Sequence, residues 1–198
     1  MSMAAEGFAQ RHRLTLDEFL RMGEAGILGE DARVELIEGD LIDMAPIGSR
    51  HAAVVGRLTH LLVQAAGDRA IVWVQNPISI DEHSMPQPDI ALLKPRADSY
   101  SSAHPRPEEV LLIIEVAETT LAYDVKVKLP LYARAGIPEF WVIDIEHARI
   151  TRYSDPRNDA YTRTEPISLA EVDLLPLPGV SVDLSTLPIR AESSRSEP

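Results

Sequence analysis

The fold is decided by the stretch Val110-Leu111-Leu112-Ile113-Ile114-Glu115-Val116-Ala117. Its nearly continuous run of branched apolar residues is typical of a strand that is buried on both faces in the middle of a sheet. Glu115 interrupts that run. A carboxylate in such surroundings is costly unless it is paired or binds a metal. The stretch therefore predicts a central strand that carries one paired or functional carboxylate.

Helix and strand signals on both sides of this strand predict an α/β or α+β sheet sandwich. The expected helices run from Leu16 to about Glu24, opened by a Thr15–Glu18 capping box, from a Ser49 cap to about Ala66, and from Thr119 or Thr120 to near Ala135. The expected strands are a hairpin of Val34–Ile37 and Leu41–Met44, strands over Ile71–Ile80 and Asp89–Leu93, and a hairpin over 140–144 and 148–153. We expect one domain over residues 13–189, a flexible leader over 1–12 and a disordered tail over 190–198.

Composition narrows the classes of function. The 198 residues include no cysteine, which excludes disulfides, thiolate zinc sites and cysteine nucleophiles. No apolar run approaches the ~20 residues that span a bilayer, and no signal-peptide pattern opens the chain, so we expect a cytoplasmic protein without membrane contact. The net charge of −12 counts against an obvious nucleic-acid binder.

Two carboxylates are candidate metal ligands. Asp89 opens one predicted strand and Glu115 lies within another, so neighbouring positions in the sheet would bring them together. Hard cations such as Mg²⁺ or Mn²⁺ favour oxygen ligands of this kind, and such an ion can activate water and neutralise a phosphate. The alternative for Asp89 is a turn residue after Pro88, and for Glu115 a structural salt bridge inside the sheet.

Lys128 is a third candidate, with two interpretations. It follows Asp124 by four residues, so it could form an ordinary ion pair on a helix surface. It could instead reach the strand end that carries Glu115 and orient an attacking water. Pro130 favours a helix that begins only near residues 124–127, which would leave the proline in the first turns.

Glu35 and His51 complete the candidate set. Glu35 lies in an apolar strand and could be a further metal ligand or a plain exposed residue. His51 lies near the start of a predicted helix and could be a site residue or a neutral histidine at the end of the apolar face. His60 should face the other way, and no pair of histidines has zinc spacing.

These residues, read in order, resemble a family of bacterial restriction endonucleases that is abundant in cyanobacteria. The matching segments are Arg33-Val34-Glu35-Leu36-Ile37-Glu38-Gly39, Ser49-Arg50-His51, Gln87-Pro88-Asp89-Ile90, Ile114-Glu115-Val116, and the stretch from Tyr123 to Asp144, which is the most specific. The resemblance spans roughly residues 13–190 and implies the PD-(D/E)XK nuclease superfamily. It implies a restriction-endonuclease-like α/β core, with a mixed central sheet flanked by helices, an N-terminal helix and hairpin, and a C-terminal β extension.

The same resemblance implies roles for individual residues. Asp89 and Glu115 become metal ligands together with the backbone carbonyl of Val116, while Glu35 becomes an auxiliary acid and His51 a further site residue. One position departs from the standard motif, because Ala117 stands where a lysine is expected. The family displaces that lysine onto the following helix, as Lys128. Lys126 is a weaker substitute, since two residues along a helix turn by about 200°.

The leading hypothesis is a Mg²⁺- or Mn²⁺-dependent DNA endonuclease that could act as a homodimer. Metal-activated water would attack the phosphate, and Lys128 would orient the water and stabilise charge. A second hypothesis is a catalytically weak or inactive nuclease-fold protein that binds or regulates a partner, which the acidic charge and the missing standard lysine favour. A third is a hydrolase that uses paired carboxylates on sugars without a metal.

Overall fold

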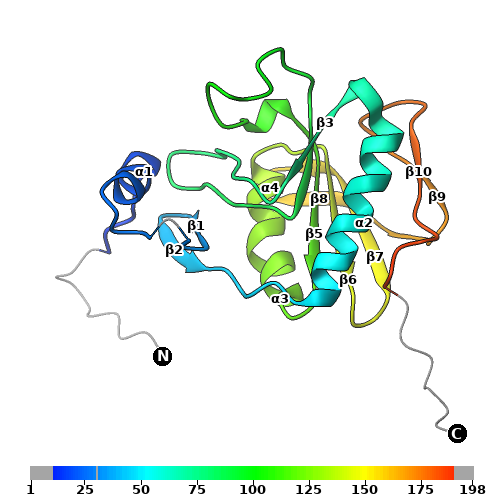
Figure 1. The fold of residues 1–198 in the computed structure, drawn as a ribbon, viewed down its shortest axis with the longest axis horizontal. Coiled ribbons are helices and arrows are strands. Elements are labelled where there is room, and N and C mark those ends of the chain that lie inside the picture. Colours follow the sequence, from blue (N-terminus) through cyan, green and yellow to red (C-terminus); the bar gives the residue numbers. More distant parts are fainter. Residues whose placement is uncertain (1–10, 30, 190–198) are drawn as a thin grey trace, which may run out of the picture.

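The computed structural model describes residues 11–29 and 31–189, whose centre is a six-stranded mixed sheet with the strand order β3-β4-β5-β6-β7-β8 (Figure 1). The strands are β3 (Ile71–Val74), β4 (Ile90–Leu93), β5 (Val110–Ala117), β6 (Glu139–Asp144), β7 (Arg149–Arg157) and β8 (Ala160–Ile167). Neighbours pair antiparallel except β5 and β6, which are parallel. The apolar stretch that contains Glu115 is therefore a central strand, as predicted.

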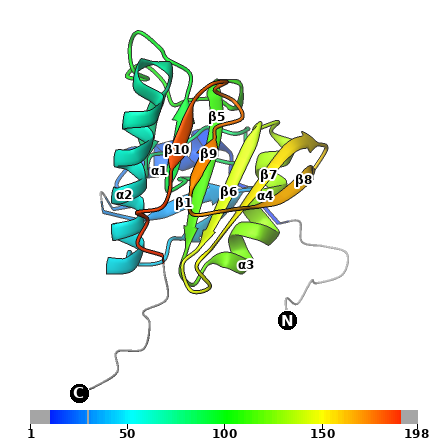
Figure 2. The ribbon, with the colours of Figure 1, turned by 90° about the vertical axis from the view of Figure 1, so that its right-hand side faces the viewer.

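Helices cover both faces of this sheet (Figures 1 and 2). Helix α2 (Ser49–Ala66) packs on one face, where the short hairpin of β9 (Glu171–Asp173) and β10 (Ser181–Asp183) extends the same apolar core. Helix α4 (Leu129–Arg134) packs on the other face, against a core that includes Tyr132 and Phe140. The mixed α/β fold with helices around a central sheet and a C-terminal β extension is confirmed.

Alternation along β5 assigns its side chains to the two cores. Leu112, Ile114 and Val116 lie in the core under α2. Ile113 and Ala117 lie in the core under α4, so the residue between them, Glu115, points to the same side. The carboxylate therefore faces the helical crossover that follows β5 in the chain.

The crossover helix begins directly after Thr120, as the two threonines predict, and earlier than Pro130 indicates. It begins at α3 (Leu121–Tyr123), continues as the π-helical segment η3 (Asp124–Lys128) and ends in α4. The amide of Leu129 bonds to the carbonyl of Asp124, five residues back, directly before Pro130. The prediction of a later start was wrong because a wider π turn absorbs a proline, whose missing N–H and bulky ring a regular helix would not accommodate.

A helix and a hairpin precede the main sheet. Helix α1 (Leu16–Glu24) begins with the predicted capping box, in which Thr15 and Glu18 exchange hydrogen bonds. Strands β1 (Val34–Ile37) and β2 (Asp40–Asp43) form the predicted antiparallel hairpin. The amide of Met85 donates to the carbonyl of Leu36 at 2.7 Å and docks β1 onto the loop before β4.

Two further predictions need correction, and two others lie wholly or mostly outside the described residues. The strand predicted over residues 71–80 ends at Val74, because Gln75 adopts a positive φ of 49° and leaves the extended region. The N-cap of α2 is Gly48 and not Ser49, and no side chain caps it. The predicted tail over 190–198, and all but residues 11 and 12 of the leader, lie outside the described residues.

No helix within the described ranges is both long and apolar enough to cross a bilayer.

Candidate active site

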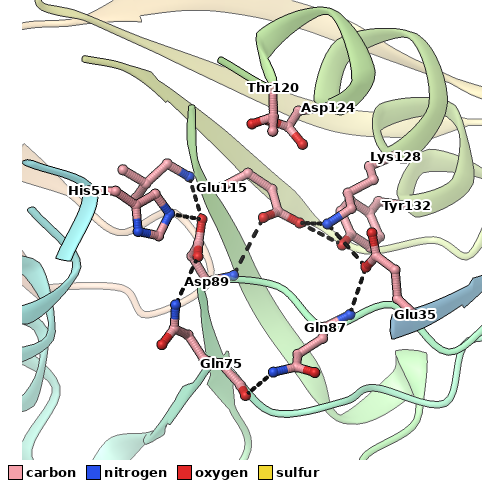
Figure 3. A network of polar contacts seen from close by, with 11 residues as sticks. Glu35, His51, Gln75, Gln87, Asp89, Glu115, Thr120, Asp124, Lys128 and Tyr132 are labelled. Atoms are coloured by element: carbon pink, nitrogen blue, oxygen red, sulfur yellow. Dashed lines mark hydrogen bonds and ion pairs between the residues drawn. The ribbon is translucent and has the colours of Figure 1, made fainter. Parts of the chain in front are cut away.

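Asp89 and Glu115 come from neighbouring antiparallel strands. Ile90 pairs with Ile114, and continuing this register by one residue places Asp89 opposite Glu115. The two residues are linked through the backbone as well: Asp89 N–H donates to Glu115 Oε2 at 3.4 Å, and Val116 N–H donates to Asp89 Oδ2 at 2.9 Å. The strand pairing thus brings together the two carboxylates that the sequence singled out (Figure 3).

Lys128 reaches Glu115 from the crossover helix. Its Nζ lies 3.1 Å from Glu115 Oε1, and both residues are almost fully buried, with exposed fractions of 4% and 3%. Tyr132 donates from its hydroxyl to the same oxygen at 2.9 Å. Within residues 11–29 and 31–189 no ion pair joins Lys128 to Asp124, which instead accepts a hydrogen bond from Thr120 at 2.8 Å. The surface ion pair considered for Lys128 is therefore not formed, and the exposed Lys126 lies outside the network.

Glu35 is the second carboxylate on Lys128. Its Oε2 lies 3.2 Å from Nζ and accepts the Gln87 amide at 3.1 Å. Its exposed fraction is 3%, so the alternative of a plain exposed strand residue is wrong. The N-terminal hairpin thereby contributes a charged group to the centre of the molecule, which Figure 3 shows on the side of Lys128 away from Asp89.

His51 approaches Asp89 from the first turn of α2. Its Nε2 lies 3.0 Å from Asp89 Oδ2, and the hydrogen bond to Asp89 raises the pKa of the imidazole against the opposing effect of burial. Gln75 donates to the other oxygen, Oδ1, at 3.3 Å, and its own carbonyl accepts Gln87 Nε2 at 2.6 Å. Asp89 is thus held on three sides by groups from α2, β5 and the loop after β3.

A cavity of about 340 Å³ opens onto these groups. Its wall contains the polar side chains of Glu35, His51, Asp89, Glu115, Asp124 and Lys128 together with apolar residues that follow β2. This volume falls at the small end of the range typical of ligand pockets. The cavity is therefore large enough for a phosphate group and part of a nucleotide beside the carboxylates.

Burial perturbs the acids that surround this cavity. Removal from water raises the pKa of Glu115 to about 8 despite the nearby Lys128, and it raises the pKa of Asp124 to about 6. Burial alone would lower the pKa of Lys128, but the carboxylates of Glu115, Glu35 and Asp124 outweigh it and raise that pKa above its ordinary value. Clusters of perturbed groups in a cavity are typical of functional sites.

The donor set fits a divalent metal that keeps part of its water shell. Asp89 Oδ2 and Glu115 Oε1 each accept two hydrogen bonds, whereas Asp89 Oδ1 and Glu115 Oε2 each accept one long bond, of 3.3 and 3.4 Å. Each carboxylate thus retains an oxygen with spare acceptor capacity. Across the described ranges no group of three or more His, Asp or Glu side chains has metal-binding spacing. Two carboxylates completed by water and substrate are a usual arrangement for Mg²⁺.

Tyr132, Gln75 and Gln87 belong to this hydrogen-bonded network, and Asp124 lines the cavity beside it, but none of the four was predicted as a site residue. The ring of Tyr132 is buried in the apolar core and packs edge-on against Phe140, with 5.2 Å between the ring centres. Only its position four residues after Lys128, on the same side of the helix, could have indicated that its hydroxyl faces Glu115. Gln87 lies in the matching segment before Asp89 without a role assigned to it, and no sequence signal marks Gln75; both side chains reach the site from irregular loops.

The six-stranded mixed sheet flanked by helices gives the chain a restriction-endonuclease-like α/β fold. The chain belongs to the Uma2 family, described as "Putative restriction endonuclease", whose model matches residues 16–189. A similar crystal structure is described as that of "a putative nuclease belonging to DUF820" from Anabaena variabilis ATCC 29413. It has a TM-score of 0.59 and 18% identity, over 81% of this chain and 88% of that chain. At this identity the likeness concerns the fold. No curated protein matches the sequence.

Proposed function

We propose that the protein is an endonuclease that hydrolyses phosphodiester bonds of DNA with the help of Mg²⁺ or Mn²⁺. The observation that carries the proposal is the convergence of Asp89, Glu115 and Lys128 on one cavity, in a chain of a nuclease family. Metal-assisted phosphodiester hydrolysis needs oxygen ligands for the ion and a cation near the charge that develops on phosphate. These three side chains supply both.

Asp89 and Glu115 would hold the metal, joined by the backbone carbonyl of Val116. When bound, the ion would supply Lewis acidity and lower the pKa of a coordinated water. His51 keeps the Asp89 carboxylate in place through the 3.0 Å contact. The chain's part in the chemistry is therefore to fix two oxygen ligands beside a cavity that admits phosphate.

Lys128 acts as a cation in this mechanism. Its raised pKa keeps the ammonium protonated at neutral pH, so it can orient a water and stabilise negative charge but cannot accept a proton. Glu35 holds it from the opposite side at 3.2 Å. Because the whole chain carries a net charge of −12, the attraction for DNA must come from local cations, including the metal. The homodimer considered from the sequence stays a prediction.

One observation favours the alternative of a catalytically weak or inactive binding module. Lys128 is 4% exposed and already contacts two carboxylates, so a phosphate must compete with Glu35 and Glu115 for its ammonium. Such a protein would bind DNA or another partner without cutting it. Cleavage and binding assays on the same preparation therefore separate the two functions.

The test uses the purified protein with supercoiled plasmid and labelled oligonucleotides, in Mg²⁺, Mn²⁺ or a chelator. We expect metal-dependent nicking by the wild type and a loss of at least about 100-fold in Asp89→Asn and Glu115→Gln, because a lost metal ligand removes the activated water. Asp68→Asn, an exposed carboxylate in the turn after α2, is the matched control and should cut normally. Binding without cleavage would favour the binding module, and neither cleavage nor binding would reject the endonuclease.

A further inference from the structure

Two donors from the crossover helix converge on one oxygen of Glu115. Lys128 Nζ lies 3.1 Å and the Tyr132 hydroxyl 2.9 Å from Oε1, while the one donor to Oε2 within residues 11–29 and 31–189 is the Asp89 amide, at 3.4 Å. Figure 3 shows Glu115 between Asp89 on one side and the Lys128–Tyr132 pair on the other. The two oxygens of this carboxylate thus have different surroundings, one anchored and one nearly free.

We propose that Tyr132 is a positioning residue for Glu115. Its hydroxyl holds Oε1 of that carboxylate, so that Oε2 stays available to the metal. The inference rests on the proposed function, in that it assumes a divalent ion bound by Glu115. It assigns to a residue of the apolar core a specific role in the metal site. Tyr132 is not among the residues that line the cavity, so it would act through Glu115 and not by touching metal or substrate.

Lys128 alone is a poor anchor for this purpose. Its ammonium is shared between Glu115 and Glu35, at 3.1 and 3.2 Å, and it ends a flexible four-carbon chain. A shift of the ammonium toward Glu35 would leave the Glu115 carboxylate free to rotate. The orientation of Oε2 therefore needs a second donor that cannot follow Lys128.

Tyr132 has the rigidity that this task requires. Its side chain is fully buried, and its ring packs edge-on against Phe140 with 5.2 Å between the ring centres. Only the hydroxyl reaches out of the apolar core, and its oxygen meets Oε1 at normal hydrogen-bond length. Groups that orient metal ligands in this way typically change metal affinity or activity by about 10–100-fold when they are removed.

Tyr161 provides a matched control within the same core. It is also buried, at 8% exposed, and its ring stacks on Phe140, but its hydroxyl has no hydrogen-bond partner among the described residues. Tyr161→Phe therefore removes the same atom from the same apolar core without touching Glu115. Any effect of losing a buried hydroxyl as such should be common to both variants.

The test measures Mn²⁺ affinity of the full-length protein by calorimetry and by the paramagnetic resonance of free Mn²⁺, without DNA. We expect Tyr132→Phe to bind Mn²⁺ about 10-fold more weakly than wild type, and Tyr161→Phe to bind within twofold of it. In a Glu115→Gln background the additional effect of Tyr132→Phe should vanish, because the hydroxyl acts through that carboxylate. Circular dichroism and thermal unfolding report whether each variant is folded.

The outcomes separate this inference from the proposed function. Unchanged Mn²⁺ affinity in a folded Tyr132→Phe variant would overturn it, as would equal losses in both tyrosine variants or a loss that persists beside Glu115→Gln. A wild type that binds no Mn²⁺ would also reject the inference. A Tyr132→Phe variant that fails to fold would reject it too, because the hydroxyl would then be needed for stability. If Mn²⁺ affinity falls as expected while the wild type cuts no DNA, the endonuclease fails and the role of Tyr132 stands.

Discussion

Lys128 Nζ and Glu115 Oε1 lie 3.1 Å apart in the interior, although 13 positions separate the two residues in the chain. The contact joins the central strand β5 to the crossover helix that follows it. It exists because alternation along β5 turns Glu115 toward that helix, and because the π-helical segment before Pro130 carries Lys128 inward. Stability and the proposed chemistry therefore depend on the same pair.

Removing the lysine should destabilise the fold. Lys128→Met leaves Glu35 and Glu115 buried without their cation, and breaking a buried ion pair costs about 3–5 kcal/mol. Urea unfolding followed by circular dichroism measures the loss. Lys126→Met is the control, because that side chain is exposed and its change should stay within about 0.5 kcal/mol. A loss below about 1 kcal/mol for Lys128→Met would contradict the burial of a charged pair.

His51, in the first turn of α2, should matter for activity more than for stability. His51→Ala removes the 3.0 Å contact to Asp89 Oδ2, and we expect kcat/KM for metal-dependent cleavage to fall about 10–100-fold. His60→Ala, on the exposed side of the same helix, should cleave like the wild type. Equal rates for the two variants would show that the backbone amide of Val116 suffices to hold Asp89.

Two glycines should respond in opposite directions to alanine. Gly39 joins β1 to β2 at a φ of 86°, and an added Cβ would lie 2.6 Å from that of Arg13. Gly39→Ala should therefore lower the free energy of unfolding by about 1–3 kcal/mol. Gly56 lies inside α2 with nothing within 4 Å of an added Cβ, so Gly56→Ala should raise it by about 0.5–1 kcal/mol. Thermal and urea unfolding measure both, and a stable Gly39→Ala protein would argue against this turn.

Glu139 should make stability depend on pH. Burial raises the pKa of this β6 carboxyl above 4.5, although Trp141 donates to it at 2.6 Å and Arg152 lies 2.8 Å away. Between 4.5 and the raised value the folded state binds more protons than the unfolded state, so stability falls as pH rises. Glu139→Gln removes this dependence.

The measurement compares urea unfolding of wild type and Glu139→Gln between pH 4.5 and 8. The wild type should lose stability relative to the variant as pH rises through the folded-state pKa. Glu146→Gln, an exposed glutamate in the turn after β6, should run parallel to the wild type. A wild type that gains stability over Glu139→Gln with rising pH would show that the ion pair with Arg152 outweighs burial.

The sequence predicted most of the framework because local rules and tertiary packing agree there. Helix α1 begins with the capping box at Thr15, the 3.6-residue period is found as helix α2, and the apolar run is found as strand β5, all as expected. The predictions that were wrong lie where the backbone adopts a conformation that the spacing of apolar residues does not indicate. Gln75 ends β3 through a positive φ, and the π turn lets the crossover helix begin before Pro130.

For the site, the sequence by itself determined which residues are costly to bury: a glutamate in an apolar strand, an aspartate at a strand start and a lysine on a helix. Only the tertiary structure decided their partners. The pairing register set Asp89 opposite Glu115, and docking of the N-terminal hairpin brought Glu35 to Lys128. The spacing of Tyr132 from Lys128 indicates which side of the helix it lies on, but it does not give the partner of its hydroxyl, because a buried tyrosine looks the same in sequence whether its oxygen has a partner or not. Tyr161 in the same core has none among the described residues.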